Sequence, residues 1–375
     1  MRLLYICDAL AVYGGLERVL IEKANWLAKQ KGYEVCLLTV NQGEHLVSFP
    51  LHPDVQFEDL GIQFHQQYQL PFCRRFFLNR QLHRLFRERL AYQIQAKASD
   101  VIICTRLDYI RDVISVKGDK PLVFESHSLC LASHFEGDGL LRRLHIRYLQ
   151  LAVRKAAMTV ALTQGDADEW RKLTPRVCVI PNVVHLNDSG LYSDCTAKSA
   201  IFVGRFSKQK DVGSLLRIWT LVHERFPDWC LHIYGGYGEE QDSIFAKIKQ
   251  MDANIQVHEA TSHMMEKYIE SSILLMTSSY EPFGLVLPEA MSCGLPVVAF
   301  DCPYGPADII TDGVGFIIKN WDKAQFANCV CQLIEDENKR VEIGKAGILL
   351  SQRYLADYIM PQWIKLFKMI IGDSK

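Results

Sequence analysis

Short runs of apolar residues alternate with longer amphipathic stretches from one end of this 375-residue chain to the other. Buried parallel strands are short apolar runs of about four to eight residues, whereas amphipathic stretches have the periodicity of helices. Their regular alternation is typical of α/β domains in which helices cover both faces of a parallel sheet. The pattern therefore predicts a doubly wound α/β architecture.

The apolar runs form two series separated by a polar stretch. We expect strands in the first series at 3–7, 34–40, 100–104, 122–126, 158–162 and 177–181. The second series predicts strands at 200–206, 229–236, 255–260, 273–278, 295–300 and 315–319. Amphipathic stretches predict helices near 15–30 and 76–97, and another at about 354–371. Between the two series, polar turn residues dominate at 181–199, which indicates a domain boundary.

The length also favours two domains, because single cores stop growing near about 250–300 residues. We expect a Rossmann-like domain at 1–182, a linker at 183–198 and a second Rossmann-like domain at 199–353. A terminal helix within 354–375 is expected to pack back on the first domain. Two such domains in tandem leave a central cleft between the carboxyl ends of their strands, where ligands of these sheets bind.

The cysteines and histidines show no spacing of a metal site. The chain has 12 cysteines without a CxxC pair and 12 histidines without an HExxH pair. Several cysteines lie in or beside apolar runs, so we expect reduced thiols in a reducing compartment, and neither metal nor cofactor. The first ten residues, MRLLYICDAL, predict a buried strand rather than a cleavable signal. These observations predict a cytoplasmic protein.

Charge is unevenly distributed along the chain. Residues 1–185 carry 24 Lys and Arg against 19 Asp and Glu, a net +5, whereas residues 186–375 carry 18 against 24, a net −6. A basic half suggests contact with something anionic. Nucleic acid is not expected, because the charge is confined to two helical segments and no recognised binding module is present.

Two basic segments account for much of this charge. Residues 70–97 contain seven Lys and Arg and one acidic residue, and residues 140–158 contain five and none. In the first segment the apolar residues that fall on one helical stripe are Leu78, Leu82, Leu85, Phe86, Leu90 and Ile94. Such helices can lie on an anionic membrane surface or bind the diphosphate of a lipid-linked acceptor. The alternative is a helix packed on its own domain with solvated arginines.

The segment YGGLER, residues 13–18, follows the first predicted strand and opens the first predicted helix. Gly14 and Gly15 let the backbone approach a ligand closely, and a helix N-terminus presents free N–H groups to an anion. A simple tight turn explains the same residues, and the segment is not the GxGxxG fingerprint.

The segment VGRFSKQKD, residues 203–211, follows the first strand of the second predicted domain. Arg205 stands at a strand end and Lys210 at the start of the next helix, where two cations can straddle a diphosphate. The alternative is a pair of solvated surface charges.

The strongest signal is EPFGLVLPEAMSCGLPVVAFD, residues 281–301. We expect Glu281 to close a strand and the turn at Phe283 and Gly284 to lead into a helix that contains Glu289. Carboxylates can accept hydrogen bonds from sugar hydroxyls, and the turn amides and helix N-terminus favour bound negative charge. Ordinary helix-start charges would leave the flanking Pro-Phe-Gly and Cys-Gly-Leu-Pro unexplained.

Together these segments resemble the retaining glycosyltransferases of family 4, which have the GT-B fold. Glu281 and Glu289 match the E-x7-E motif of that family, VGRFSKQK its VGR…K stretch, and YGGLER its Gly-Gly loop. The run DCPYGPADII, residues 301–310, is similar to members that assemble bacterial surface polysaccharides and lipid-linked oligosaccharides. The resemblance implies a nucleotide-sugar donor, with UDP-sugar favoured over GDP-sugar. It also implies retaining transfer without a metal to a glycan or polyprenyl-diphosphate-linked acceptor.

The resemblance also assigns roles to matching residues. Glu289 would hold the ribose hydroxyls of the nucleotide. Arg205 and Lys210 would neutralise the departing diphosphate, and His127, in FESHS, would stand beside the transferred sugar, although a lone histidine after a strand is often structural. The residues that would hold the donor sugar and its phosphates are Glu281, Phe283, Gly284 and Leu285, with amides of Gly14 and Gly15 assisting at the diphosphate.

Two residues depart from the family pattern. Asp211 follows the motif lysine where the family has glycine, which places a carboxylate near the expected diphosphate site. Val183 follows Asn182 where the family often has Asn-Gly. Two other functions of the same architecture stay open: a sugar-nucleotide 2-epimerase and a non-catalytic nucleotide-sugar-binding protein.

Overall fold

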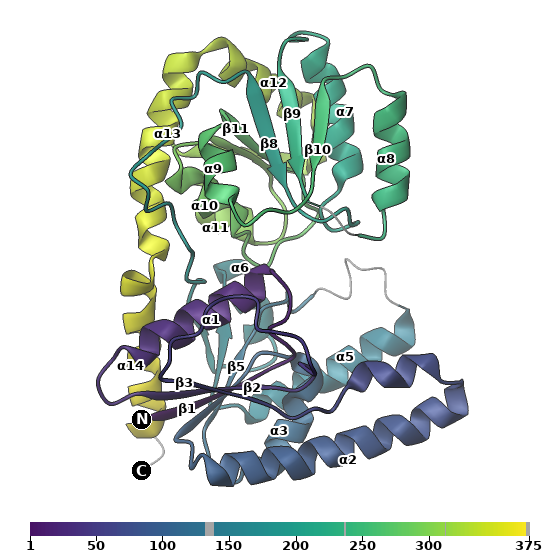
Figure 1. Ribbon diagram of the computed structural model, residues 1–375, viewed down its shortest axis with the longest axis vertical. Coiled ribbons are helices and arrows are strands. Elements are labelled where there is room, and N and C mark those ends of the chain that lie inside the picture. The colour runs from purple at the N-terminus through teal and green to yellow at the C-terminus, as the bar shows by residue number, and fades with distance from the viewer. Residues whose placement is uncertain (132–138, 236–237, 312, 373–375) are drawn as a thin grey trace. The chain divides into compact units, whose positions relative to one another are not determined.

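The computed structural model describes residues 1–131, 139–235, 238–311 and 313–372. The chain forms two compact units (Figure 1). Unit 1 comprises Met1–Val183 and the segment from Ala356, and unit 2 comprises Val184–Leu355. Each unit contains one parallel sheet with helices on both faces, so the predicted doubly wound α/β fold is confirmed.

The sheet of unit 1 has seven strands in the order β3-β2-β1-β4-β5-β6-β7, and all neighbours are parallel. The strands are β1 (Arg2–Cys7), β2 (Glu34–Thr39), β3 (Val55–Asp59), β4 (Val101–Cys104), β5 (Leu122–Glu125), β6 (Met158–Ala161) and β7 (Val177–Val179). The strand order reverses between β1 and β4. Ligands of open parallel sheets bind outside the carboxyl ends of the strands at such a switch point.

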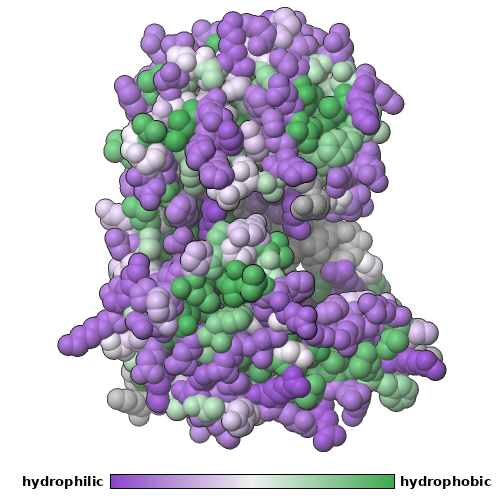
Figure 2. Space-filling model, viewed as in Figure 1, coloured by the Kyte–Doolittle hydropathy of each residue, from purple (hydrophilic) through white to green (hydrophobic). Residues whose placement is uncertain are grey.

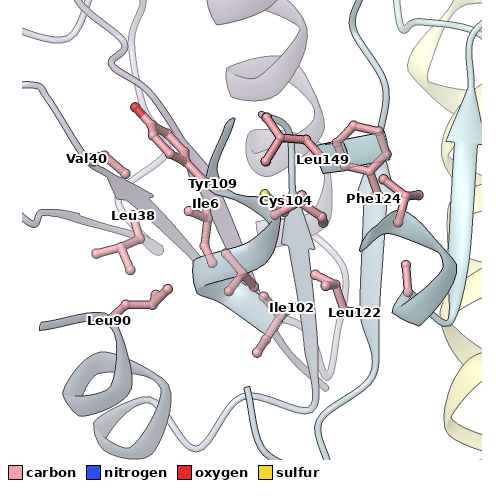
Figure 3. Packing of buried hydrophobic residues seen from close by; sticks show 14 of the residues in the cluster. Ile6, Leu38, Val40, Leu90, Ile102, Cys104, Tyr109, Leu122, Phe124 and Leu149 are labelled. Carbon is pink, nitrogen blue, oxygen red and sulfur yellow. The ribbon is translucent and has the colours of Figure 1, made fainter. Parts of the chain in front are cut away.

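Helices cover both faces of this sheet because its strands bury residues on alternate sides. Leu4 and Ile6 of β1 belong to a core cluster on one face, and Leu3 and Tyr5 to a cluster on the other. Figure 3 shows the first cluster, in which sheet residues such as Ile102 pack with helix residues. The helices are α1 (Gly15–Ala28), α2 (Phe72–Ala96), α3 (Ile110–Val116), α5 (Leu140–Ala152), α6 (Gln164–Arg171) and α14 (Ala356–Gly372). Short 3-10 turns are η1 (Phe64–Gln69), η2 (Leu107–Tyr109) and η3 (Val153–Lys155).

The terminal helix α14 belongs to unit 1. Its residues Met360, Trp363 and Phe367 are buried in the core cluster that also contains residues of α1. Trp26 of α1 donates a hydrogen bond from Nε1 to Asp357 Oδ1 at 2.8 Å. The helix completes one face of the unit 1 sheet.

The sheet of unit 2 has six parallel strands in the order β10-β9-β8-β11-β12-β13. The strands are β8 (Ser199–Val203), β9 (Cys230–Tyr234), β10 (Ile255–His258), β11 (Ile273–Met276), β12 (Val297–Phe300) and β13 (Gly315–Ile318). The helices are α7 (Val212–His223), α8 (Gln241–Gln250), α9 (Met264–Ile269), α10 (Val286–Ser292), α11 (Gly305–Ile309), α12 (Lys323–Glu335) and α13 (Glu337–Ser351), with 3-10 turns η4 (Lys319–Trp321) and η5 (Gln352–Tyr354). The switch point lies between β8 and β11, so the loops after these two strands are neighbours.

The polar stretch before β8 belongs to unit 2 and is held by hydrogen bonds within that unit. The amide of Asn187 donates to Ser292 Oγ at 3.0 Å, and Ser193 Oγ donates to the Ser271 carbonyl at 2.5 Å. Buried Arg340 donates two hydrogen bonds to the carbonyl of Cys195, at 3.1 and 2.8 Å. These contacts fix the course of a segment that has no regular secondary structure.

Cysteines with described side chains are all free thiols, and most are buried. None of the described helices combines the length and the apolar character that crossing a bilayer requires.

Candidate functional site

The loops that follow β8 and β11 are joined by hydrogen bonds at the switch point of unit 2. Thr277 Oγ1 donates to the carbonyls of Lys210 and Asp211, both at 3.1 Å. The amide of Ser279 donates to the Gln209 carbonyl at 2.7 Å. Two of the predicted segments, VGRFSKQKD and the one that begins at Glu281, are therefore brought together.

Lys210 and Glu281 form an ion pair between these loops. Lys210 Nζ donates to Glu281 Oε1, and Ser278 Oγ donates to the same oxygen at 2.8 Å. The side chains are 16% and 6% exposed. An ammonium has three donors, and Lys210 uses one of them within the described part of the chain, so two can bind phosphate oxygens. Glu281 Oε2 accepts no hydrogen bond from the part of the chain that is described, so it can take one from a substrate hydroxyl.

Glu281 does not close a strand, contrary to our expectation. Strand β11 ends at Met276, and Glu281 is fixed by a single β-bridge to Tyr304. Its amide donates to the Pro303 carbonyl at 2.7 Å, and its carbonyl accepts from the amides of Tyr304 and Gly305 at 2.9 and 3.0 Å. The run at 301–310 thus positions the backbone of Glu281.

The turn after Glu281 presents three backbone N–H groups. The amides of Phe283, Gly284 and Leu285 donate to no described residue. Phe283 anchors the turn, because its ring is buried and packs edge-on against Tyr354 with centroids 5.4 Å apart. Gly284 has φ +94°, a conformation that favours glycine. A Cβ on Gly305 would lie 1.9 Å from the Phe283 carbonyl oxygen, so this position also requires glycine.

Glu289 lies in the first turn of α10, as predicted, and is 9% exposed. Tyr268 of α9 donates from its hydroxyl to Glu289 Oε2 at 3.3 Å, and Tyr268 itself is completely buried. The tyrosine holds the carboxylate in a defined orientation. Nothing in the sequence distinguishes Tyr268 or Ser278 from other residues of their kind, so both were missed.

Asp211 is the N-cap of α7. Its backbone has φ +44°, in the left-handed region that aspartate tolerates better than most residues with a side chain. Its Oδ1 accepts from the Ser214 amide at 3.0 Å and its Oδ2 from Ser214 Oγ at 2.5 Å. Both carboxylate oxygens are therefore engaged at the helix start. This arrangement explains how aspartate can replace the glycine of the family pattern.

Arg205 follows β8 and is exposed. It forms no ion pair with any described residue.

Gly204, the residue before Arg205, lies under the side chain of Lys210, since a Cβ there would be 3.2 Å from Lys210 Cδ. A Cβ on Gly235, at the end of β9, would lie 1.9 Å from the Gly204 carbonyl oxygen. The two glycines allow the strand ends beneath Lys210 to pack closely.

The predicted residues of unit 1 lie at the carboxyl ends of its strands. Gly14 is the extended N-cap of α1, and Gly15 is the first residue of that helix. The amide of Gly14 donates to the Val12 carbonyl at 2.8 Å. His127 follows β5, and its Nε2 lies 3.0 Å from Glu125 Oε1. Glu125, the last residue of β5, was not singled out in the sequence because it lies within an apolar run.

The two basic segments form α2 and α5, and they differ in what they expose. Four residues of the α2 stripe are buried in the unit 1 core and the other two pack against it, so this stripe does not face a membrane. Helix α5 instead presents apolar residues to the solvent. We call these the α5 patch: Leu140, Leu141, Leu144, Tyr148 and Leu151. Figure 2 shows hydrophobic and hydrophilic residues intermingled over this part of unit 1.

Among the residues described, no three His, Cys, Asp or Glu side chains are grouped so that they could hold a metal ion.

Comparison with known families gives two adjoining matches. The family described as Glycosyltransferase Family 4 matches residues 13–188, and the family described as Glycosyl transferases group 1 matches residues 192–349. Together the two matches cover the strands of both sheets except β1, which precedes residue 13.

Relatives and solved structures resemble the chain over most of its length. The amylovoran biosynthesis glycosyltransferase AmsD of Erwinia amylovora is 28% identical, over 96% of this chain and 98% of that protein. The lipopolysaccharide 1,6-galactosyltransferase of Escherichia coli is 28% identical, over 76% of this chain and 77% of that protein. TarM of S. aureus, solved as a variant with fondaparinux, α-GlcNAc-glycerol and UDP, has a TM-score of 0.78 at 15% identity, over 98% of this chain and 99% of that chain.

Proposed function

Because the chain belongs to the family 4 glycosyltransferases of the GT-B fold, we propose that it transfers a sugar from a nucleotide-sugar to a glycan or a polyprenyl-diphosphate-linked acceptor. The observation that carries this proposal is the arrangement at the switch point of unit 2. There, a lysine, a glutamate and three amides that donate to none of the described residues share one edge of the sheet. These groups can neutralise a diphosphate and accept hydrogen bonds from sugar hydroxyls.

We propose that the donor is a UDP-sugar, with a GDP-sugar as the alternative. The presence of UDP in the TarM structure supports this choice. Glu289, oriented by Tyr268, holds the ribose hydroxyls. Glu281 Oε2 accepts a hydrogen bond from the donor sugar, and the amides of Phe283, Gly284 and Leu285 bind the phosphates.

The proposed reaction proceeds with retention of configuration and without a metal. The bond between the anomeric carbon and the diphosphate oxygen breaks, and the acceptor oxygen bonds that carbon on the same face. The acceptor proton passes to the leaving phosphate. Lys210 and Arg205 stabilise the charge that develops on the diphosphate, a kind of electrostatic stabilisation that contributes about 3–4 kcal/mol per donor in other enzymes. His127 is assigned to the transferred sugar and the Gly15 amide to the diphosphate. The Gly14 amide takes part only if it leaves the Val12 carbonyl to which it now donates.

Donor binding can be tested by thermal unfolding in the presence of UDP-, GDP- and ADP-sugars. A ligand that binds only the folded protein at 100 times its dissociation constant adds about 2.7 kcal/mol of stability. We expect one UDP-sugar to raise the unfolding temperature most. No shift with any of the three nucleotide classes would contradict the proposal.

The reaction is then followed with the stabilising donor and glycan or lipid-diphosphate acceptors. We expect a product whose new linkage has the anomeric configuration of the donor, as measured by the proton coupling of the anomeric signal in NMR. A parallel sample without acceptor should show no isomerised donor. An epimer in that sample would indicate a sugar-nucleotide 2-epimerase instead, and binding without turnover would indicate a non-catalytic binding protein.

We further propose that the α5 patch lies on an anionic membrane surface where a lipid-linked acceptor resides. The support is the combination of exposed Leu140, Leu141 and Leu144 with the arginines of the same helix and no acidic residue in 140–158. Each Lys or Arg near such a surface contributes about 1 kcal/mol. Apolar side chains on a basic helix are typical of interfacial binding.

Flotation with vesicles measures this binding directly. We expect the protein to float with vesicles containing phosphatidylglycerol and to stay behind with pure phosphatidylcholine. Replacing Leu141 and Leu144 with serine should abolish flotation, whereas Leu349→Ser in α13, an equally exposed leucine of unit 2, should not. Equal flotation of both variants would contradict a role of the α5 patch.

A further inference from the structure

A lysine and a glutamate are completely buried together in unit 1. Lys23 Nζ of α1 lies 2.5 Å from Glu125 Oε1 at the end of β5, and each side chain is 1% exposed. The lysine ammonium also lies 3.5 Å from the ring centroid of Trp363 in α14 and 5.4 Å from that of Tyr5 in β1. Four elements of unit 1 thus surround one pair of opposite charges.

The same carboxylate faces His127. Glu125 Oε1 lies 3.0 Å from His127 Nε2, and the histidine side chain is 8% exposed. The two atoms are close enough for a hydrogen bond but are not aligned as one. Neither His127 Nε2 nor Glu125 Oε2 has another hydrogen-bond partner in the described part of the chain.

Stability alone does not account for this pair. Replacing a buried ion pair with apolar residues of similar size is often neutral or stabilising, because both charges lose their hydration in the folded protein. Lys23 has a different effect on Glu125. Burial alone would raise the pKa of Glu125, but its interactions with Lys23 and His127 outweigh it and lower that pKa to about 2. The carboxylate beside the histidine therefore stays ionised.

We propose that Glu125 is a positioning residue for His127 and that Lys23 is its buried counter-ion. An ionised carboxylate at Nε2 favours the tautomer that carries its proton there, which leaves Nδ1 as the nitrogen that can accept a hydrogen bond. This inference rests on the proposed place of His127 beside the transferred sugar. Trp363 and Tyr5 enclose the counter-ion and exclude water from it.

The first test separates positioning from structural support. The double variant Lys23→Met with Glu125→Leu removes both charges and leaves no unpaired buried charge. Its unfolding temperature should therefore be close to that of the wild type. Its kcat should nevertheless fall by about 10- to 100-fold, as is typical when an orienting partner is lost, with KM for the donor nearly unchanged. The matched control removes Lys97 and Glu58, a more exposed pair of the same unit, and should leave kcat unchanged. Recovery of kcat together with stability in the Lys23–Glu125 double variant would overturn the proposal.

The second test does not depend on activity. The ¹⁵N chemical shifts of the His127 ring report its tautomer, and a His127→Gln sample identifies the signals. We expect the Nε2–H tautomer in the wild type and a mixture of tautomers in the double variant lacking Lys23 and Glu125. An unchanged tautomer in that variant would contradict the proposal. If His127→Ala leaves sugar transfer unchanged, the role of His127 in the proposed function fails, and the tautomer still decides whether Glu125 positions the ring.

Discussion

Lys210 Nζ donates a hydrogen bond to Glu281 Oε1, and this contact joins the loop after β8 to the loop after β11. The two strands are neighbours at the switch point of the unit 2 sheet. The pair therefore holds a cation and a carboxylate in a fixed arrangement where ligands of such sheets bind. Groups fixed in advance stabilise developing charge without reorganising during the reaction.

Replacing Lys210 with methionine should lower kcat/KM by about 100- to 1,000-fold, the loss seen when one electrostatic donor is removed from other active sites. The remaining Glu281 carboxylate loses its counter-ion while it is still largely buried, which should destabilise unit 2 by about 1–3 kcal/mol. Steady-state kinetics and urea unfolding measure the two effects. Lys208→Met is the control, because Lys208 is an exposed neighbour on the same loop. A similar loss of activity in the control would show that the effect is not specific to Lys210.

Replacing Glu289 with glutamine should weaken donor binding by about 1.5–3 kcal/mol, because the ribose hydroxyls lose a charged acceptor. Tyr268→Phe should weaken it by a smaller amount, about 0.5–1.5 kcal/mol, since only the hydrogen bond that orients the carboxylate is removed. Calorimetric titration of both variants with the donor measures the two losses of binding free energy and shows which is larger. Unchanged affinity in Glu289→Gln would remove this residue from the donor site.

Asp211 permits a comparison of two small residues at one left-handed position. Asp211→Ala loses the hydrogen bond from the Ser214 amide that caps α7, and it keeps a Cβ at φ +44°. It should therefore lose about 1–2 kcal/mol of stability. Asp211→Gly removes the Cβ that strains the left-handed backbone, so it should lose only about 0.3 kcal/mol of stability. Urea unfolding of both variants gives the comparison. If alanine were as stable as glycine, the left-handed backbone conformation would not matter here, and if both were as stable as the wild type, the cap would not matter either.

Burial raises the pKa of Asp166 in α6 to about 7, against hydrogen bonds from the Cys130 amide and Trp170 Nε1 that favour its ionised form. Because this pKa is higher in the folded than in the unfolded protein, the contribution of Asp166 to stability is present below about pH 4 and is lost as the pH rises to about 7. Asp166→Asn cannot titrate. Between these pH values its stability should therefore improve relative to the wild type, by up to about 1.4 kcal/mol per pH unit.

Urea unfolding across this pH range measures the difference between the two proteins. Asp168→Asn, on the exposed part of the same helix, is the control and should follow the wild-type curve. Parallel pH curves for wild type and Asp166→Asn would contradict the raised pKa.

The sequence predicted the parallel strands well because most of them are buried on both faces and therefore appear as continuous apolar runs. Strand β3 was missed for the opposite reason. It lies at the edge of the unit 1 sheet, and in VQFED the apolar Val55 and Phe57 alternate with polar residues. Such a short alternating segment differs little from a loop.

The sequence singled out the motif residues of the candidate site but not their contacts. The spacing of Glu281 and Glu289 identified them, whereas the bond between Lys210 and Glu281 joins residues 71 positions apart. Asp211 was expected to disturb the diphosphate site, yet its carboxylate caps α7. Hydrogen-bond partners of this kind depend on how loops from different strands meet. The hydrophobic periodicity of the sequence carries no information about these contacts.

The attachment of α14 to unit 1 has a consequence for the order in which the chain can fold. During synthesis, the 172 residues of Val184–Leu355 separate the first part of unit 1 from the helix that covers one face of its sheet. At about 5–20 residues per second, this face stays uncovered for about 10–35 s. Unit 2 is continuous in sequence and can close its core during that interval. Unit 1 is therefore synthesised first but completed last, and the ammonium of Lys23 cannot contact Trp363 until α14 is in place.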